Sequence, residues 1–206
     1  MLVDTRAPAH HRPPVTARYL AGAAACLTGA AATYVLAVWT RLGQGLENQN
    51  LDTAQAIGDG GWAWDLLARF GAAGTLLGAV AVILLVGFVA RRFWRGVVGV
   101  GIVGVAVLVT WYLKIVLPRP LLEQADYATG HNSFPSGHVT VAAGLVLALV
   151  LALPARGRVW ALIPGTAAVG LVAVATVVAG WHRPSDAIGG ALIAGATYCV
   201  AAAALE

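Results

Sequence analysis

The chain has 206 residues, of which 59% are hydrophobic and only 11% are charged, and its formal net charge is +4. A soluble domain averages about 25% charged residues, so this composition indicates an integral membrane protein and excludes an ordinary soluble domain. The basic excess does not indicate nucleic-acid binding, because the arginines stand at the ends of apolar segments, as topology determinants do.

Six apolar segments follow a polar, proline-containing stretch at residues 1–18, which we interpret as a cytoplasmic N-terminal arm. The segments predict an all-α, polytopic membrane domain over residues 19–206, with one transmembrane helix per segment. Residues 41–69 carry charges, glycines and two tryptophans, which predicts an extramembrane loop with a part lying at headgroup level. The expected spans are 19–39, 71–90, 96–117, 138–153, 159–180 and 186–205.

The positions of the arginines predict the orientation of these spans. Six spans place both termini on one side, and the side richer in arginine is the cytoplasmic one. If the termini are inside, the inner segments hold Arg6, Arg12, Arg18, Arg91, Arg92, Arg95, Arg156 and Arg158. We therefore expect a multi-pass, N-in and C-in protein of the plasma (inner) membrane. The connections between spans three and four and between spans five and six then lie at the outer, extracytoplasmic face.

The first of these connections ends in a polar stretch that opens directly onto an apolar segment. Residues 131–138 read His-Asn-Ser-Phe-Pro-Ser-Gly-His, and Ser136 and Gly137 stand where a helix would begin. Free backbone N–H groups and the positive end of the helix dipole attract anions at such a position. His138 adds an imidazole beside this expected anion site. An ordinary polar connection is the alternative interpretation of the same residues.

The second connection carries a histidine and an aspartate four residues apart, His182 and Asp186. One helical turn separates them, so both side chains face the same way if the last helix begins there. A carboxylate bonded to one ring nitrogen fixes the tautomer and leaves the other nitrogen free as a nucleophile. The plainer alternative is a His–Asp pair that only caps the helix.

Phosphoryl transfer needs positive charge on the phosphate oxygens, a nucleophile in line and an acid for the leaving group. Lys114 and Arg119 supply charge at the same outer face, and the arginine can grip two oxygens. His182 would be the nucleophile and His138 the acid. All roles are filled without a metal or another cofactor, and nearby cations would repel a metal ion.

These residues resemble the type 2 phosphatidic acid phosphatase (PAP2) superfamily, in its membrane lipid phosphatase branch. The family has three motifs, K-x6-R-P, P-S-G-H and S-R-x5-H-x3-D. Residues 135–138 match the second motif fully, and His182 and Asp186 match the end of the third. Lys114 and Arg119 resemble the first. The resemblance covers about residues 110–190, and the six-helix layout fits the family's membrane branch.

The chain departs from the family pattern in two places. Lys114 and Arg119 have four residues between them rather than six, so the lysine approaches from another angle. The Ser-Arg of the third motif is here Ala175-Thr176, so one phosphate-binding arginine is missing. Arg183 is the candidate to replace it, from the other side of the nucleophile.

The resemblance implies a metal-independent phosphoric monoester or pyrophosphate hydrolase. His182 would attack to form a phosphohistidine, and His138 would protonate the leaving group and then activate water. The implied phosphate-binding residues are Lys114, Arg119, Ser136, Gly137 and Arg183. The expected partners are a lipid phosphate and the bilayer, with no nucleic acid, and the sequence does not determine an oligomeric state.

Two other functions use the same fold and stay open. The missing Ser-Arg favours a non-hydrolytic lipid-phosphate binder or transporter, whereas retention of both histidines and Asp186 favours an enzyme. Transfer of the phosphoryl group to an acceptor other than water is a third possibility. Candidate substrates are polyprenyl pyrophosphate, phosphatidic acid, phosphatidylglycerol phosphate and a polyprenyl-linked sugar phosphate. Headgroup recognition is expected in residues 41–69 and 121–134.

Overall fold

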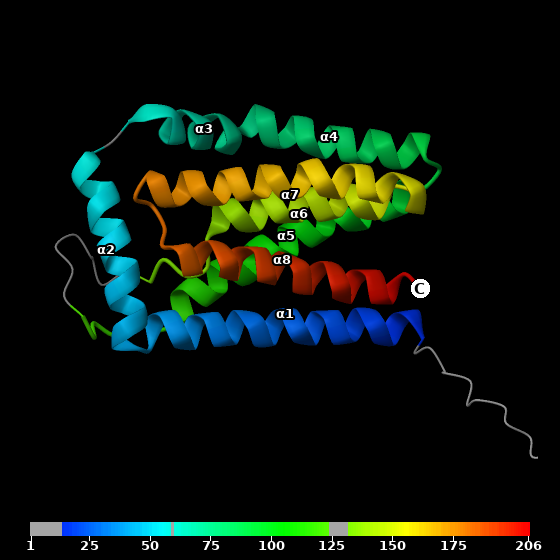
Figure 1. The fold of residues 1–206 in the computed structure, drawn as a ribbon. Helices are drawn as coiled ribbons and strands as arrows, with labels where there is room; N and C mark the ends of the chain where they lie inside the picture. Colours follow the sequence, from blue (N-terminus) through cyan, green and yellow to red (C-terminus); the bar gives the residue numbers. More distant parts are fainter. Residues whose placement is uncertain (1–13, 59, 124–131) are drawn as a thin grey trace, which may run out of the picture.

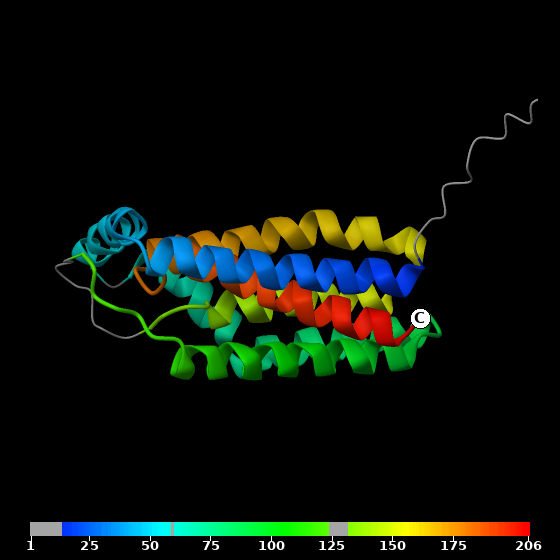
Figure 2. The same cartoon turned by 90° about the horizontal axis from the view of Figure 1, so that it is seen from below.

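The computed structural model describes residues 14–58, 60–123 and 132–206, and every regular element within these residues is an α-helix. Long helices run side by side as a bundle, and α2 lies across one end of it (Figures 1 and 2). The helices are α1 (Val15–Val38), α2 (Arg41–Ile57), α3 (Gly61–Gly71), α4 (Ala73–Val89), α5 (Phe93–Val116), α6 (Gly137–Ala152), α7 (Ala155–Val178) and α8 (Pro184–Ala204).

A helix occupies each of the six segments that we expected to span the membrane. By length and composition, α1, α5, α7 and α8 are able to cross a bilayer. The pair α3 and α4, bent by 58° at their junction, makes a fifth candidate if the two count as one span. Helix α6 is apolar but has only 16 residues. The protein is therefore an integral membrane protein with four or five candidate spans among the described residues, and the six-span topology stays a prediction.

One expectation about the first third of the chain is wrong. Residues 41–69 are not a loop, because α2 and most of α3 occupy them. Thr40 begins α2 by accepting a hydrogen bond from the Gly43 N–H at 3.0 Å, and Gly58, at φ 86°, ends it. Helix α1 begins at Val15, so the last four residues of the predicted arm at 1–18 are helical, and the cytoplasmic placement of the arm stays a prediction. The remainder of that arm, 1–13, lies outside the described residues.

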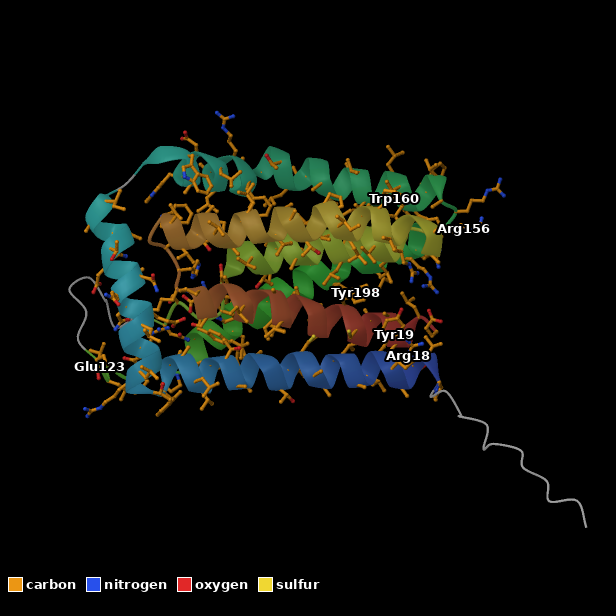
Figure 3. The ribbon with its side chains drawn as sticks, in the orientation of Figure 1. Arg18, Tyr19, Glu123, Arg156, Trp160 and Tyr198 are labelled. Atoms are coloured by element: carbon orange, nitrogen blue, oxygen red, sulfur yellow. The ribbon has the colours of Figure 1, made fainter. Side chains whose placement is uncertain are left out.

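The two ends of the bundle carry different elements. One end, which we call the α2 end, holds α2, the start of α3 and Glu123 (Figures 1 and 3). The other, which we call the opposite end, holds the beginning of α1 with Arg18, the loop beside Arg156, and the C-terminus (Figures 1 and 3). The start of α1 and the end of α8 thus lie at the same end of the bundle.

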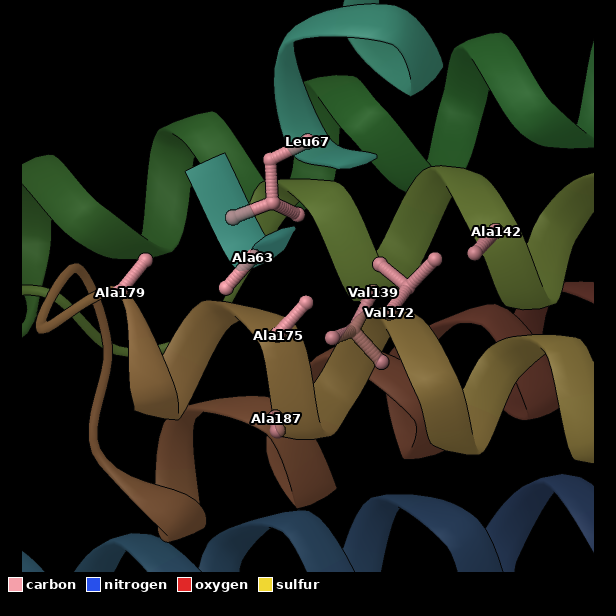
Figure 4. Packing of buried hydrophobic residues seen from close by; sticks show 8 residues of the cluster. All are labelled: Ala63, Leu67, Val139, Ala142, Val172, Ala175, Ala179 and Ala187. Atoms are coloured by element: carbon pink, nitrogen blue, oxygen red, sulfur yellow. The ribbon is translucent and has the colours of Figure 1, made fainter. Parts of the chain in front are cut away.

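A cluster of small apolar side chains locks α3, α6, α7 and α8 together near the α2 end (Figure 4). Its buried members are Ala63, Leu67, Val139, Ala142, Val172, Ala175, Ala179 and Ala187. Small residues allow the helix backbones to approach closely in a membrane protein. At Gly190 in α8, an added Cβ would stand 2.5 Å from the Ser136 carbonyl oxygen, so this contact requires glycine. The packing holds the start of α6 against the start of α8.

Candidate active site

The segment before α6 is held in place by its own hydrogen bonds and by α8. The Asn132 side chain accepts from the Phe134 N–H and donates to the Phe134 carbonyl, both at 3.1 Å. The Ser136 N–H donates to the Asp186 carbonyl at 2.7 Å. Phe134 is buried against Tyr34 of α1. The second family motif therefore sits directly on the first turn of α8, beside the residues of the third.

His182 and Asp186 contact each other as their four-residue spacing predicts. The His182 Nδ1 lies 3.3 Å from Asp186 Oδ2, and the Arg183 N–H donates to that same oxygen at 2.9 Å. The Asp186 side chain is fully buried and His182 nearly so. Because Nδ1 faces the carboxylate, Nε2 is the ring nitrogen left for chemistry.

A cavity of about 400 Å³ brings residues of all three motif regions together. Its walls come from the α3–α4 junction, the last turns of α5, the start of α6 and the turn before α8. The lining residues are Phe70, Gly71, Leu76, Val107, Lys114, Gly137, His138, Val141 and His182. Lys114 reaches the cavity from the last turn of α5 despite the shortened spacing of its motif. The cavity thus combines two imidazoles and an ammonium with an apolar wall.

The bend between α3 and α4 completes this cavity, which sequence reasoning did not foresee. A Cβ added to Gly71 would stand 3.9 Å from His138 Nε2, so the bend passes directly over the imidazole. The centroid of the His138 ring also lies 5.3 Å from that of Trp181, whose ring packs edge-on against Trp64 of α3. These contacts place the His138 ring between α3, α4 and the turn before α8.

Arg119 does not line this cavity and lies between two carboxylates. Its guanidinium nitrogens stand 3.7 Å from Asp186 Oδ1 and 3.6 Å from Glu47 Oε2, and its side chain is 4% exposed. Within the described residues, Arg119 Nη1 and Nη2 and the Ser136 Oγ are buried without a hydrogen-bond partner. Buried polar groups without partners are costly and call for an explanation. Oxygen atoms of a bound anion would supply the missing acceptors.

Arg183 is not brought into the cavity. Its Nε donates to Asn48 Oδ1 at 3.0 Å and its Nη1 to Ser133 Oγ at 3.3 Å, and the residue is 4% exposed. Thr176, which stands where the family has an arginine, is fully buried and its hydroxyl donates to the Ala173 carbonyl. Its own carbonyl accepts from the Trp181 and His182 N–H groups, both at 3.1 Å. Thr176 therefore serves the backbone turn that presents His182.

Helix α2 supplies polar residues that sequence reasoning missed. The Gln44 side chain donates to the Pro120 carbonyl at 2.6 Å and accepts from the Leu122 N–H at 3.1 Å, which fixes the loop that carries Arg119. Glu47 accepts from the Ser185 N–H and hydroxyl, both at 2.8 Å, and so caps α8. Burial raises the pKa of the Glu47 carboxyl above its ordinary 4.5.

The signal for these residues was weak, because three of the four buried residues of α2 are polar and only Leu51 is apolar, which gives no apolar periodicity. Gln44, Glu47 and Asn48 are all buried. Their spacing of three and four residues does mark one helix face, and that pattern alone could have predicted a helix here.

Comparison with known proteins gives two matches. The model of the PAP2 superfamily matches residues 94–205, which is more than half of the chain and includes all three motif regions. The fold is similar to that of the first transmembrane PAP2-type phosphatidylglycerolphosphate phosphatase from Bacillus subtilis, with a TM-score of 0.66 and 20% identity over 88% of this chain and 94% of that one. Comparison with curated proteins gave no match. The family model thus confirms the resemblance drawn from the motifs, and the chain belongs to the PAP2 superfamily.

Proposed function

We propose that the chain is a lipid phosphatase that hydrolyses a lipid phosphate or polyprenyl (pyro)phosphate through a phosphohistidine intermediate at the outer membrane face. One observation carries the proposal. Lys114, His138 and His182, from three separate segments, line one cavity, and Asp186 holds the ring of His182 from behind. A nucleophile, an acid and a cation around one space are the parts that phosphoryl transfer needs.

In the first step, His182 Nε2 attacks phosphorus while the P–O bond to the leaving group breaks. His138 donates its proton to the departing oxygen, which leaves as a lipid alcohol or a lipid phosphate. Asp186 keeps the proton of His182 on Nδ1 and stabilises the positive charge that develops on the ring. The products of this step are the protonated leaving group, a lipid alcohol or a lipid phosphate, and a phosphoryl group bonded to His182 Nε2.

In the second step, water attacks the phosphorus of the phosphohistidine. His138, now neutral, accepts a proton from that water, and the N–P bond breaks. Inorganic phosphate leaves, and both histidines return to their starting protonation states. The same imidazole therefore acts as acid and then as base.

The phosphate oxygens would be held by donors on two sides of His182. Lys114 and the N–H groups at the start of α6, near Gly137, face the cavity. Arg119 and Ser136, which do not line the cavity, would add their unpaired donors. Arg183 would join them by exchanging its hydrogen bonds to Asn48 and Ser133 for phosphate oxygens. This would compensate for the absence of an arginine at position 176.

The apolar wall of the cavity suits a substrate with a hydrocarbon chain. Leu76, Val107 and Val141 line it from three helices, directly beside the polar groups. Phosphatidylglycerolphosphate, the substrate named for the Bacillus subtilis relative, is one candidate, together with phosphatidic acid and polyprenyl phosphates. The headgroup would contact α2 and the loop after Arg119, although residues 124–131 of that loop lie outside the described residues.

Phosphate release by the detergent-purified protein tests this function. The assay would use a panel of glycerolipid and prenyl phosphates, with EDTA present, and His182→Ala beside the wild type. We expect release that persists in EDTA and disappears in the variant. Release that needs an added metal ion, or that survives in His182→Ala, would contradict the proposed mechanism.

The outer-face placement has a separate test. In a chain without Cys26 and Cys199, we would introduce Leu121→Cys at the α2 end and, as its matched control, Arg156→Cys at the opposite end. Both positions are exposed. A membrane-impermeant thiol reagent applied to intact cells should label the first and not the second. The reverse pattern would place the site on the cytoplasmic side.

A lipid-phosphate binder or transporter is the second candidate, and one observation favours it. Ala175 and Thr176 are fully buried and neutral where the family has Ser-Arg. This function predicts saturable binding of a lipid phosphate without phosphate release from any member of the panel.

A further inference from the structure

Helix α2 brings negative charge to the candidate site. The cations there are Lys114, Arg119 and Arg183, and Asp186 is the carboxylate of the His–Asp pair. Glu47, from α2, lies 3.6 Å from Arg119. Asp52, one helical turn and a residue further along α2, interacts electrostatically with Arg183. Carboxylates of α2 thus partly neutralise the positive charge of both Arg119 and Arg183.

Glu47 is fixed in this position by two hydrogen bonds. Its Oε1 accepts from the Ser185 N–H and its Oε2 from the Ser185 hydroxyl, each at 2.8 Å, and the residue is 8% exposed. A charge that is held rigidly and shielded from water acts on its neighbours more strongly than a surface charge does. Arg119 consequently shares its charge between Glu47 and Asp186 before any substrate arrives.

We propose that Glu47 is a positioning residue that limits the positive charge offered to the substrate, so that the enzyme prefers lipid phosphate monoesters to lipid diphosphates. This inference rests on the proposed function. Among the described residues, the cation that lines the cavity is Lys114. A lipid diphosphate carries about one more negative charge than a monoester. The charge of Arg119 is already shared with Glu47 and Asp186, so the extra negative charge gains little from this arginine and is repelled by both carboxylates.

The test compares a prenyl monophosphate with the diphosphate of the same chain length, through initial rates of phosphate release. The monoester loses phosphate by cleavage of its P–O bond to the lipid, and the diphosphate by cleavage of its terminal phosphoanhydride. We expect the wild type to have a kcat/KM at least about tenfold higher for the monoester. In Glu47→Gln, the ratio of diphosphate to monoester kcat/KM should rise about tenfold.

Two further variants separate charge from architecture. Glu47→Asp keeps the carboxylate and should restore a ratio close to that of the wild type. Asp65→Asn removes the same charge from an exposed position on α3, at the same end of the bundle, and should leave the ratio within about twofold. A general loss of stability would lower both rates and would not change their ratio. If Glu47→Gln does not fold, Asp52→Asn should shift the ratio in the same direction by a smaller factor.

Four outcomes would overturn the inference. A wild type that prefers the diphosphate, or a Glu47→Gln variant with an unchanged ratio, would do so while leaving the lipid phosphatase standing, because phosphate is still released. A ratio that rises equally in Asp65→Asn would show a general surface-charge effect instead. Absence of release from both substrates, and from the whole lipid panel, would remove the proposed function and this inference with it.

Discussion

The two ends of the bundle hold charged residues in opposite ways. At the α2 end, Arg119 and Arg183 are each about 4% exposed, and the Arg119 guanidinium has buried nitrogens without hydrogen-bond partners in the described part of the chain. At the opposite end, Arg92 and Arg158 are partly exposed, and both donate to the Leu153 carbonyl, at 2.6 and 3.3 Å.

This difference indicates that the arginines of the opposite end stabilise the fold, whereas those of the α2 end serve the chemistry of the candidate site. Arginines at the opposite end satisfy carbonyls that a helix end leaves unpaired, and they keep contact with water. Burying charges and leaving donors unpaired, as the α2 end does, is expensive for a fold. We infer that this arrangement persists because a substrate completes it. Substitutions at the α2 end should therefore lower activity more than stability, and substitutions at the opposite end should lower stability more than activity.

The largest effect should come from Asp186→Asn. The amide keeps the shape of the side chain but cannot hold His182 in the tautomer with its proton on Nδ1, nor stabilise the ring when it becomes positive. We expect turnover to fall by about 10³- to 10⁴-fold. Phosphate-release kinetics give the rate, and size-exclusion elution in detergent checks the fold. A variant with more than about a tenth of wild-type turnover would contradict the role of the pair.

A smaller effect is expected from Arg183→Ala. If this arginine exchanges its bonds to Asn48 and Ser133 for phosphate oxygens, turnover should fall at least about tenfold, which corresponds to about 1.4 kcal/mol. Arg156→Ala, which removes an exposed arginine from the opposite end, is the matched control and should stay within about twofold of wild type. Equal turnover in the two variants would restrict Arg183 to a structural role.

Arg92→Gln should show the reverse pattern. It removes the 2.6 Å hydrogen bond to the Leu153 carbonyl at the end of α6, while Arg158 keeps a longer bond to the same oxygen. We expect a loss of about 1 kcal/mol in stability, measured by thermal unfolding in detergent, with turnover unchanged within about twofold. A large loss of turnover at unchanged stability would break the distinction between the two ends.

The smallest effect concerns the pH dependence of stability. Burial raises the pKa of Glu47 in the folded protein, so the folded state holds this proton more tightly than the unfolded state does. The stability that this tighter proton binding adds to the folded state is complete below the ordinary pKa of 4.5 and is lost as the pH rises through the raised pKa. As the pH rises from 4.5 through the raised pKa, the melting temperature of the wild type should therefore fall further than that of Glu47→Gln. Parallel curves would contradict a raised pKa.

The sequence predicted the parts of the site whose chemistry is local. His182 and Asp186 are one turn apart, and the Pro-Ser-Gly-His run begins a helix, so spacing and residue type were sufficient. The six apolar segments likewise predicted the helices of the bundle. Each of these inferences depends only on residues close together in the chain.

The contribution of α2 could not be predicted in this way. Glu47 contacts Ser185 across 138 positions of the sequence, and Gln44 contacts residues 76 to 79 positions away. Such contacts are fixed by the packing of whole helices, and the polar buried face of α2 gives no apolar pattern. Arg183 illustrates a second limit, because adjacent residues in an extended turn point in different directions. Its neighbour His182 lines the cavity, whereas Arg183 does not.

Trapping the covalent intermediate tests the central claim most directly. Wild type, His182→Ala and Asp186→Asn would be mixed with an intact lipid phosphate that the wild type hydrolyses. The reactions would be quenched at alkaline pH within the first turnover and digested for mass spectrometry. We predict a phosphoryl group on His182 in the wild type, a strongly reduced amount in Asp186→Asn, and none in His182→Ala. Steady hydrolysis in a wild type whose His182 is never phosphorylated would contradict the account.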